Sequence, residues 1–255
     1  MSRTRPSEAT TALVKYVFLD VVGFTRDRSV EAQTEIVGIL GHIARQATRD
    51  RASGARNTIY LPTGDGLCIA LVDLRLAFDA HLAVALDILA SIAAHNAATA
   101  DPMRQFQVRI GLAENVDNLL VDINGNRNVA GAGINTAQRV MSVGDGGHVI
   151  SSHTVFESLR HRERYLESFR GLSAVVKHGL HLPVYQFIEA DHQGLSTTLP
   201  SSFVSPTPPL QRLQAYLLAH ALKHEAFFAA QAPRGQMRSA ANVLLYFRFL
   251  SRICG

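Results

Sequence analysis

The sequence predicts an α+β, ferredoxin-like fold over residues 13–190. Three observations support this fold class. Apolar runs of strand length and stretches of helical periodicity follow one another in the order βαββαβ from residue 13 to about residue 152. Residues 105–113 alternate apolar and polar side chains, as a half-buried strand does. The two helical stretches between the strands can both pack on one face of an antiparallel sheet.

The first half of the domain is defined by local signals. Residues 15–20 are rich in β-branched and aromatic side chains and predict a strand. A helix is expected over residues 29–46, where Ser29 is placed as the N-cap and apolar residues recur at helical spacing. Residues 58–61 and 67–72 are short apolar runs around a turn with two glycines, which is typical of a hairpin.

The second half continues this alternation of helices and strands. His81, on the apolar side of the next helix, is expected to be a core or interface histidine. The expected elements are a helix over 73–98, strands over 105–113 and 119–123, helices over 131–141 and 153–159, and strands over 148–152, 173–177 and 183–188.

Composition changes mark the domain boundaries. Residues 1–12 are polar and expected to be disordered, and the folded domain is expected to occupy residues 13–190. Residues 191–209 are rich in Pro, Ser and Thr and predict a linker. Residues 210–255 predict a helical extension, either a hairpin packed on the domain or its dimer mate, or a basic amphipathic membrane contact.

The overall composition restricts the class of protein. The chain has 255 residues, 47% of them hydrophobic, which is ordinary for a globular core. Cys68 and Cys254 provide no disulfide framework and fit a reducing cytosol, so a cytoplasmic location is expected. No signal peptide or transmembrane segment is predicted. The net charge of +4 is spread along the chain, which argues against nucleic-acid binding.

Two acidic residues are predicted to bind metal. Asp20 ends the first strand within residues 18–25, and Asp65 lies in the glycine-containing turn of the hairpin. Two carboxylates held close together repel unless cations neutralise them, and Mg²⁺ or Mn²⁺ prefers oxygen ligands. We therefore predict two divalent cations about 4 Å apart, with Val21 as a third metal residue. The alternative is that both acids only stabilise turns.

Two further segments are predicted to contact a polyphosphate substrate. The backbone N–H groups of the glycine-containing turn after Asp20 would hold phosphates, and they belong to Val22, Gly23, Phe24 and Thr25. Asn135 and Arg139 are spaced i, i+4 on one helix face, where an amide and a guanidinium suit a transition state that gains charge. Lys177 is a candidate phosphate contact, and an exposed lysine at a strand end is the alternative.

Four of these segments, in this order, resemble the class III nucleotidyl cyclases over roughly residues 13–189. They are residues 18–25, residues 63–66 around Asp65, residues 108–111, and residues 131–139 with Asn135 and Arg139. The resemblance implies a homodimer with active sites at the subunit interface. One chain would supply Asp20 and Asp65, and the other Asn135 and Arg139. The implied product is a 3′,5′-cyclic nucleotide with pyrophosphate.

The positions that read a purine base in this family differ here. Leu61 stands where adenylate cyclases usually have Lys and guanylate cyclases Glu, and Asn128 stands where adenylate cyclases have Asp or Thr. A buried base edge left without its partner costs about 1–3 kcal/mol. Tyr60 is expected to fill space beside a smaller base. The pattern resembles bacterial pyrimidine cyclases of anti-phage defence, which make cyclic UMP or cyclic CMP and activate a separate effector protein; we favour UTP as substrate.

Three alternatives stay open at this point. The chain could be a divergent adenylate or guanylate cyclase, because Leu61 and Asn128 alone do not define a base. It could be a cyclase-like module that binds nucleotides without turnover, although the catalytic positions are all filled. A two-metal polymerase palm shares the ferredoxin-like layout, but no basic template groove is evident in the sequence.

Overall fold

The computed structural model describes residues 10–51, 57–72, 75–176 and 180–203. The helices and strands, with the bounds that the structure gives them, are β1 (Thr10–Val21), α1 (Val30–Arg51), β2 (Thr58–Pro62), β3 (Gly66–Leu71), α2 (Ala80–Ala98), β4 (Val108–Val121), β5 (Arg127–Ala130), α3 (Ala132–Met141), β6 (Val149–Ser152), α4 (His153–Leu159), β7 (Phe169–Val176) and β8 (Leu180–Phe187). Single 3₁₀ turns occur at Pro102–Arg104, Glu163–Tyr165 and Ser201–Phe203.

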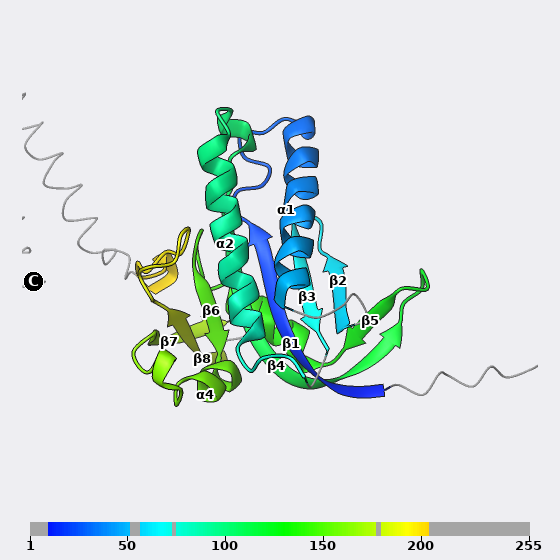
Figure 1. Cartoon of the computed structure of the whole chain (residues 1–255), viewed down its shortest axis with the longest axis vertical. Helices are drawn as coiled ribbons and strands as arrows, with labels where there is room; N and C mark the ends of the chain where they lie inside the picture. Colours follow the sequence, from blue (N-terminus) through cyan, green and yellow to red (C-terminus); the bar gives the residue numbers. More distant parts are fainter. Residues whose placement is uncertain (1–9, 52–56, 73–74, 177–179, 204–255) are drawn as a thin grey trace, which may run out of the picture. The chain divides into compact units, whose positions relative to one another are not determined.

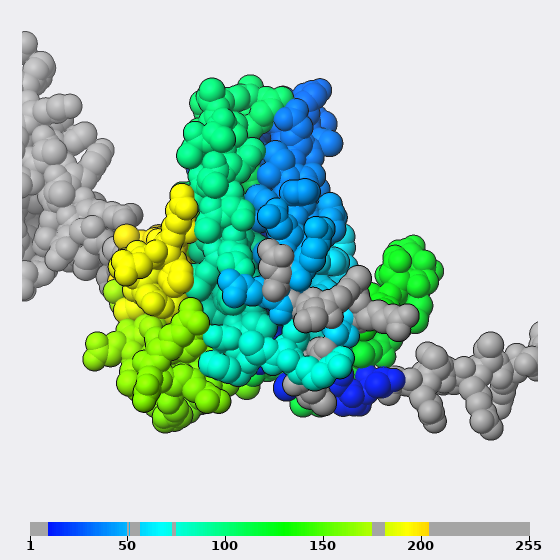
Figure 2. Space-filling model, in the orientation of Figure 1, coloured from blue at the N-terminus to red at the C-terminus, as the bar shows by residue number. Residues whose placement is uncertain are grey.

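The strands form one mixed sheet in the order β2-β3-β1-β4-β6-β8-β7, and β5 pairs with the outer part of β4. Every neighbouring pair is antiparallel except β4 and β6, which are parallel. Helices α1 and α2 lie side by side over the sheet (Figure 1) and cover the face that Figure 2 presents. The predicted α+β fold class is confirmed.

Alternation along β1 divides the core into two layers. Val17, Leu19 and Val21 are buried in the cluster formed with α1 and α2. Tyr16 and Phe18 are buried in a second cluster, which includes Ala137 and Met141 of α3. Because successive side chains of a strand point to opposite faces, α3 lies on the face of the sheet opposite α1 and α2. The same alternation directs Asp20 to the α3 face.

The structure corrects several expected boundaries. Residues 10–12, expected to be disordered, belong to β1, which pairs with β4 from Thr10 opposite Leu119. Strand β4 runs unbroken to Val121 and joins two strands that were expected to be separate, because β1 and β5 pair with its outer part. Strand β5 was not predicted.

Helix boundaries also differ from the expected ones. Helix α1 continues to Arg51, five residues beyond the predicted end, while the predicted cap is confirmed by the bond from the Ala32 N–H to Ser29 Oγ at 3.2 Å. Helix α2 begins at Ala80 rather than at residue 73. The residue before it, Asp79, does not cap the helix with its side chain, because its carboxylate accepts a hydrogen bond from the hydroxyl of Tyr165 at 2.8 Å.

Helix α2 is a core element. His81 is fully buried in it, as predicted, and burial, followed by the charge of Lys15, lowers its pKa well below the ordinary value. Within the part of the chain that the structure describes, α2 is the one helix long and apolar enough to cross a membrane, and half of that window is buried.

The first part of the expected linker packs on the domain. Ser201 donates from its N–H and its hydroxyl to the two carboxylate oxygens of Asp145, at 2.6 and 2.8 Å. Gln186 of β8 donates to the carbonyl of Thr198 at 2.6 Å. The compact unit that contains the sheet therefore includes residues up to Phe203. The helical extension predicted over residues 210–255 lies outside the described residues.

Candidate active site

The two acidic residues meet at the ends of neighbouring strands. Asp20, near the end of β1, stands opposite Gly66 of β3 in the register, and Asp65 immediately precedes that strand. The N–H of Val21 donates to the carbonyl of Asp65 at 3.1 Å. Burial raises the pKa of Asp20, and the nearby Asp65 carboxylate raises it further. The sequence prediction that these two acids come together is consistent with this geometry.

Gly66 allows this close approach. A Cβ atom built on Gly66 would lie 2.3 Å from the carbonyl oxygen of Leu19 and 3.1 Å from the Cα of Asp20. Both neighbours are backbone atoms of β1, which cannot move aside as the end of a side chain can. The glycine after Asp65 is therefore required by packing of the hairpin on β1, and that packing positions the two acids.

Arg109 is a site residue to which the sequence reasoning assigned no role. It lies directly opposite Asp20 in the β1–β4 register and donates from Nε at 3.1 Å and Nη2 at 2.8 Å to Oδ2 of Asp20. These bonds act against burial and lower the pKa of Asp20 in part. Arg109 occupies one of the polar positions in the alternating run over residues 105–113, and that is the signal that could have identified it.

The turn after Asp20 leaves three backbone donors unpaired. The N–H of Val22 donates to the carbonyl of Gln107 at 2.9 Å, so the prediction that Val22 contributes a free amide is wrong. No acceptor among the described residues binds the N–H groups of Gly23, Phe24 and Thr25. Gly23 has φ +61°, in the left-handed region, and such turns create concave sites for anions.

The side chain of Val21 is buried with α1 and α2, so only its backbone could bind a metal. Among the described residues, no group of three or more His, Cys, Asp or Glu side chains gathers that could hold a metal ion. The donor set at this end of β1 is therefore two carboxylates and a carbonyl. These are hard oxygen ligands that fit Mg²⁺ or Mn²⁺ rather than softer metals.

Helix α3 presents the other two candidate catalytic residues to solvent. Asn135 and Arg139 are exposed. The amide of Asn135 donates to the carbonyl of Gly131 at 3.4 Å. No hydrogen bond or ion pair within the described residues joins either side chain to Asp20 or Asp65.

The start of α3 is anchored by a buried acid that sequence reasoning missed. Asp117 of β4 is only 4% exposed. Its Oδ2 accepts from the hydroxyl of Tyr16 at 2.6 Å and from the N–H of Gly133 at 3.0 Å. A Cβ on Gly131 or Gly133 would collide with its carboxylate, which explains the small residues at the beginning of this helix.

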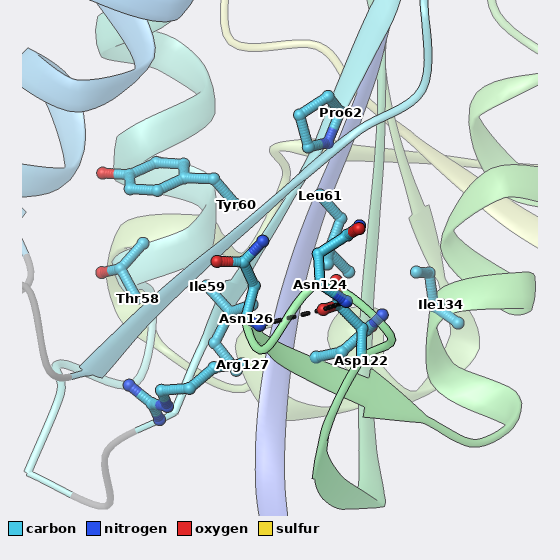
Figure 3. A pocket seen from close by; sticks show the side chains of 11 residues that line it. Thr58, Ile59, Tyr60, Leu61, Pro62, Asp122, Asn124, Asn126, Arg127 and Ile134 are labelled. Atoms are coloured by element: carbon cyan, nitrogen blue, oxygen red, sulfur yellow. Dashed lines mark hydrogen bonds between the residues drawn. The ribbon is translucent and has the colours of Figure 1, made fainter.

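The expected base-recognition residues line one pocket of about 840 Å³ between β2 and the β4–β5 hairpin. Leu61, Asn128 and Ile134 of α3 all contribute to it, and Figure 3 shows Leu61 and Ile134 on its walls. Asp122 and Asn126 of the turn between β4 and β5 give this pocket a polar edge.

Tyr60 is among the residues that line this pocket, as expected, but its ring is directed to the α1 side of the sheet. Its hydroxyl is hydrogen-bonded to Thr48 of α1, and its ring packs against the cluster under α1 and α2. Leu61 packs in the opposite cluster, on the α3 side. Because neighbouring strand residues point to opposite faces, the ring of Tyr60 and the side chain of Leu61 lie on different sides of β2. Lys177 lies outside the described residues.

Comparisons with solved structures identify the same fold elsewhere. The catalytic core of a rhodopsin-guanylyl cyclase with converted specificity, in complex with ATPαS, is 21% identical with a TM-score of 0.56, over 71% of this chain and 98% of that one. The guanylyl cyclase Cya2 is 14% identical with a TM-score of 0.59, over 74% and 99%. The adenylyl cyclase CyaB from P. aeruginosa is 15% identical with a TM-score of 0.52, over 72% and 97%.

A scan of protein-family models and a search of curated proteins find no match. The structural neighbours establish that the chain has the fold of adenylyl and guanylyl cyclase catalytic domains.

Proposed function

We propose that this protein is a metal-dependent nucleotide cyclase, which converts a nucleoside triphosphate into a 3′,5′-cyclic nucleotide and pyrophosphate. One observation carries the proposal. Asp20 and Asp65 meet at a strand end directly beside a turn with three unpaired amides, in a fold shared with cyclase catalytic domains. Acids for cations and amides for phosphates are the groups that a bound metal triphosphate requires.

Asp20, Asp65 and the carbonyl of Val21 would hold two Mg²⁺ or Mn²⁺ ions. When bound, such ions would polarise the α-phosphate and lower the pKa of the ribose 3′-hydroxyl. The amides of Gly23, Phe24 and Thr25 bind the β- and γ-phosphates. The 3′-hydroxyl gives up its proton to solvent as its oxygen bonds to the α-phosphorus, the bond from that phosphorus to the α,β-bridging oxygen breaks, and pyrophosphate leaves with the electron pair of that bond.

The enzyme acts as a homodimer with shared sites. Asn135 and Arg139 are exposed and, among the described residues, form no hydrogen bond or ion pair with the acidic pair of their own chain, so they are available to complete the site of another copy. In that arrangement, Asn135 and Arg139 of the partner subunit donate to the oxygens that gain charge in the transition state. This division also follows from the resemblance to class III cyclases.

The base pocket favours a pyrimidine, with UTP as the substrate and cyclic UMP as the product. Leu61 cannot donate to or accept from a base edge, whereas Asn128 can do both. A purine edge facing Leu61 would lose a partner, at a cost of about 1–3 kcal/mol. With the ring of Tyr60 turned away, selection for the smaller base rests on Leu61, Asn128 and Ile134. A purine cyclase is the second candidate, because the structural neighbours are adenylyl and guanylyl cyclases.

The cellular role that we propose is synthesis of a cytoplasmic second messenger in bacterial anti-phage defence, read by a separate effector protein. Its support is the resemblance of the base-recognition positions to those of pyrimidine cyclases. Lys177 stays a candidate phosphate contact on the same ground. Phage challenge of cells that carry the wild type or Asp20→Ala, with cyclic nucleotides measured in extracts, tests this role.

A product assay with each nucleotide tests the activity. The full chain is incubated with Mn²⁺ and ATP, GTP, CTP or UTP separately, and the products are separated by chromatography. We expect cyclic UMP and pyrophosphate, and neither from Asp20→Ala or Asp65→Ala. Faster cyclisation of ATP or GTP would contradict the pyrimidine pocket. Tight binding of triphosphate without pyrophosphate release would identify a nucleotide-binding regulator instead.

A further inference from the structure

The turn between β1 and α1 is held from behind by one side chain, that of Arg28. Its Nη1 donates to the carbonyl oxygens of Gly23, at 2.6 Å, and Phe24, at 3.2 Å. Its Nε donates to the carbonyl of Met103 at 3.1 Å, and its Nη2 to the carbonyl of Gln105 at 3.0 Å. One guanidinium therefore joins the turn to the segment that follows α2.

These bonds, together with the turn bond from the Arg26 N–H to the carbonyl of Gly23 at 3.0 Å, determine where the amides of the turn point. In a trans peptide unit the carbonyl and the N–H of the next residue point in opposite directions. The carbonyls of Gly23 and Phe24 point to Arg28, so the N–H groups of Phe24 and Thr25 point away from it. Those are two of the three amides that bind no acceptor among the residues described.

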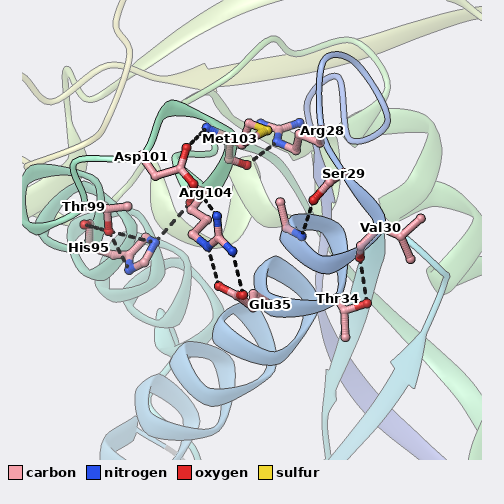
Figure 4. A network of polar contacts seen from close by, with 11 residues as sticks. Arg28, Ser29, Val30, Thr34, Glu35, His95, Thr99, Asp101, Met103 and Arg104 are labelled. Atoms are coloured by element: carbon pink, nitrogen blue, oxygen red, sulfur yellow. Dashed lines mark hydrogen bonds and ion pairs between the residues drawn. The ribbon is translucent and has the colours of Figure 1, made fainter.

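The other side of Arg28 rests on a fixed support. Arg104 makes a two-bond ion pair with Glu35 of α1, with Nε–Oε2 at 2.6 Å and Nη2–Oε1 at 2.9 Å. Asp101 accepts from the N–H of Met103 at 3.0 Å and also pairs with Arg104. Figure 4 shows Arg28 and this network side by side, between the start of α1 and the 3₁₀ turn that contains Met103. The segment that carries the carbonyls of Met103 and Gln105 is thus held against α1 by the ion pair of Arg104 with Glu35.

Arg28 also leaves its positive charge available to an anion. All four of its acceptors are neutral carbonyls. Within the described ranges, no carboxylate forms an ion pair with it. A cation directly behind outward-facing amides adds to the attraction of a phosphate. A lysine could keep the charge, but its single nitrogen cannot span acceptors on two segments as the planar fork does.

We infer that Arg28 is a positioning residue for the triphosphate: it does not touch the substrate, but it sets the direction of the amides at Phe24 and Thr25. This inference rests on the proposed function, in which these amides bind the β- and γ-phosphates. It predicts that the fork shape of Arg28, and not its charge alone, sets the affinity for a triphosphate.

The test compares Arg28→Lys in the full chain with the wild type and with Arg160→Lys. Arg160 donates to Glu157 on α4 at 3.1 Å and forms no hydrogen bond with the turn among the residues that the structure describes, so it is a matched control for the same change. Calorimetry with inorganic tripolyphosphate and Mn²⁺ measures binding without turnover. We expect affinity to fall about tenfold in Arg28→Lys, the effect of one or two misplaced hydrogen bonds, and to stay unchanged in the control.

Kinetics with the preferred nucleotide provide a readout that loss of fold would not mimic. We expect the KM of Arg28→Lys to rise about tenfold while kcat changes by less than about threefold, because the lost contacts hold ground state and transition state alike. Arg28→Gln, which keeps two amide donors, replaces the lysine variant if the latter does not fold, and is also expected to bind more weakly.

The outcomes separate the two proposals. Equal tripolyphosphate affinities in the wild type and the folded Arg28 variants would overturn the role of Arg28, even if cyclisation is observed. Tripolyphosphate binding that depends on Arg28, without turnover of any nucleotide, would refute the cyclase and support the inference. Absence of tripolyphosphate binding to the wild type would overturn the inference, whatever the product assay shows.

Discussion

Arg109 donates two hydrogen bonds to one carboxylate oxygen of Asp20, although the two residues are 89 positions apart in the chain. The pair lies across β1 and β4, next to the turn that holds Asp65. Arg109 thus offsets part of the repulsion between two acids when no cation is between them. Burial and Asp65 nevertheless prevail, and the pKa of Asp20 stays above its ordinary value.

Asp20→Asn is expected to stabilise the metal-free protein at neutral pH. Because the folded pKa of Asp20 is raised, its contribution to stability is present below the unfolded pKa and is lost as the pH rises through the folded value. The variant should match the wild type in acid and exceed it above the folded pKa of Asp20. Melting temperatures measured across this pH range check the prediction, and Mn²⁺ should raise the melting temperature of the wild type only.

Asp145→Asn is the control of opposite sign. Burial of Asp145 acts to raise its pKa, but the two hydrogen bonds from Ser201 outweigh burial and lower it. Its contribution is therefore present above the unfolded pKa and lost in acid, so the asparagine variant should be less stable than the wild type at neutral pH.

A lower melting temperature for Asp20→Asn than for the wild type, at neutral pH and without metal, would contradict the account of the acidic pair.

Mixing two inactive variants tests the shared site. Asp20→Ala lacks a metal ligand and Arg139→Ala lacks the guanidinium on α3, so each homodimer is expected to lose activity by at least about a hundredfold. A heterodimer would contain one intact site, so mixing should restore up to about a quarter of wild-type turnover if subunits exchange at random. Pyrophosphate release reports this recovery. Its absence, with exchange verified by tagged subunits, would indicate that one chain builds a complete site.

Tyr16→Phe is expected to destabilise the protein by about 1–3 kcal/mol, because it removes a donor from the buried carboxylate of Asp117. Asp117 also accepts a hydrogen bond from the N–H of Gly133, so the change should loosen the start of α3 and lower the rate of nucleotide cyclisation. Urea denaturation measures the change. Tyr185→Phe is the matched control: its hydroxyl bonds to His153 at an exposed site, and the expected effect is below about 0.5 kcal/mol.

Gly111→Ala tests how closely α3 packs on the sheet. A Cβ at Gly111 would lie 2.3 Å from the carbonyl oxygen of Ala137 and 2.5 Å from the amide nitrogen of Met141, both backbone atoms of α3. We expect a loss of about 1–3 kcal/mol from overpacking. Gly38→Ala, in α1 with open space around the added atom, should instead stabilise by about 0.5–1 kcal/mol. Equal effects of the two changes on the denaturation midpoint would refute this packing.

The sequence by itself determined the fold class, the hairpin with Asp65, the cap at Ser29 and the helix that carries Asn135 and Arg139. Each depends on signals within a few residues: periodicity, glycines in a turn, or a side chain next to a helix start. Such patterns identify elements whatever they pack against, and so the acids at the ends of two neighbouring strands could be named in advance.

Only the tertiary structure decided that Arg109 faces Asp20, that Asp117 anchors α3, and that Arg28 turns the amides of the β1–α1 turn outward. It also decided that the ring of Tyr60, a residue that lines the base pocket, packs on the α1 side. These contacts depend on strand register and on which face of the sheet each helix covers, and shifting the register by one residue would reverse every side chain. Tyr16 and Asp117 are 101 positions apart, and no local pattern relates residues at that separation.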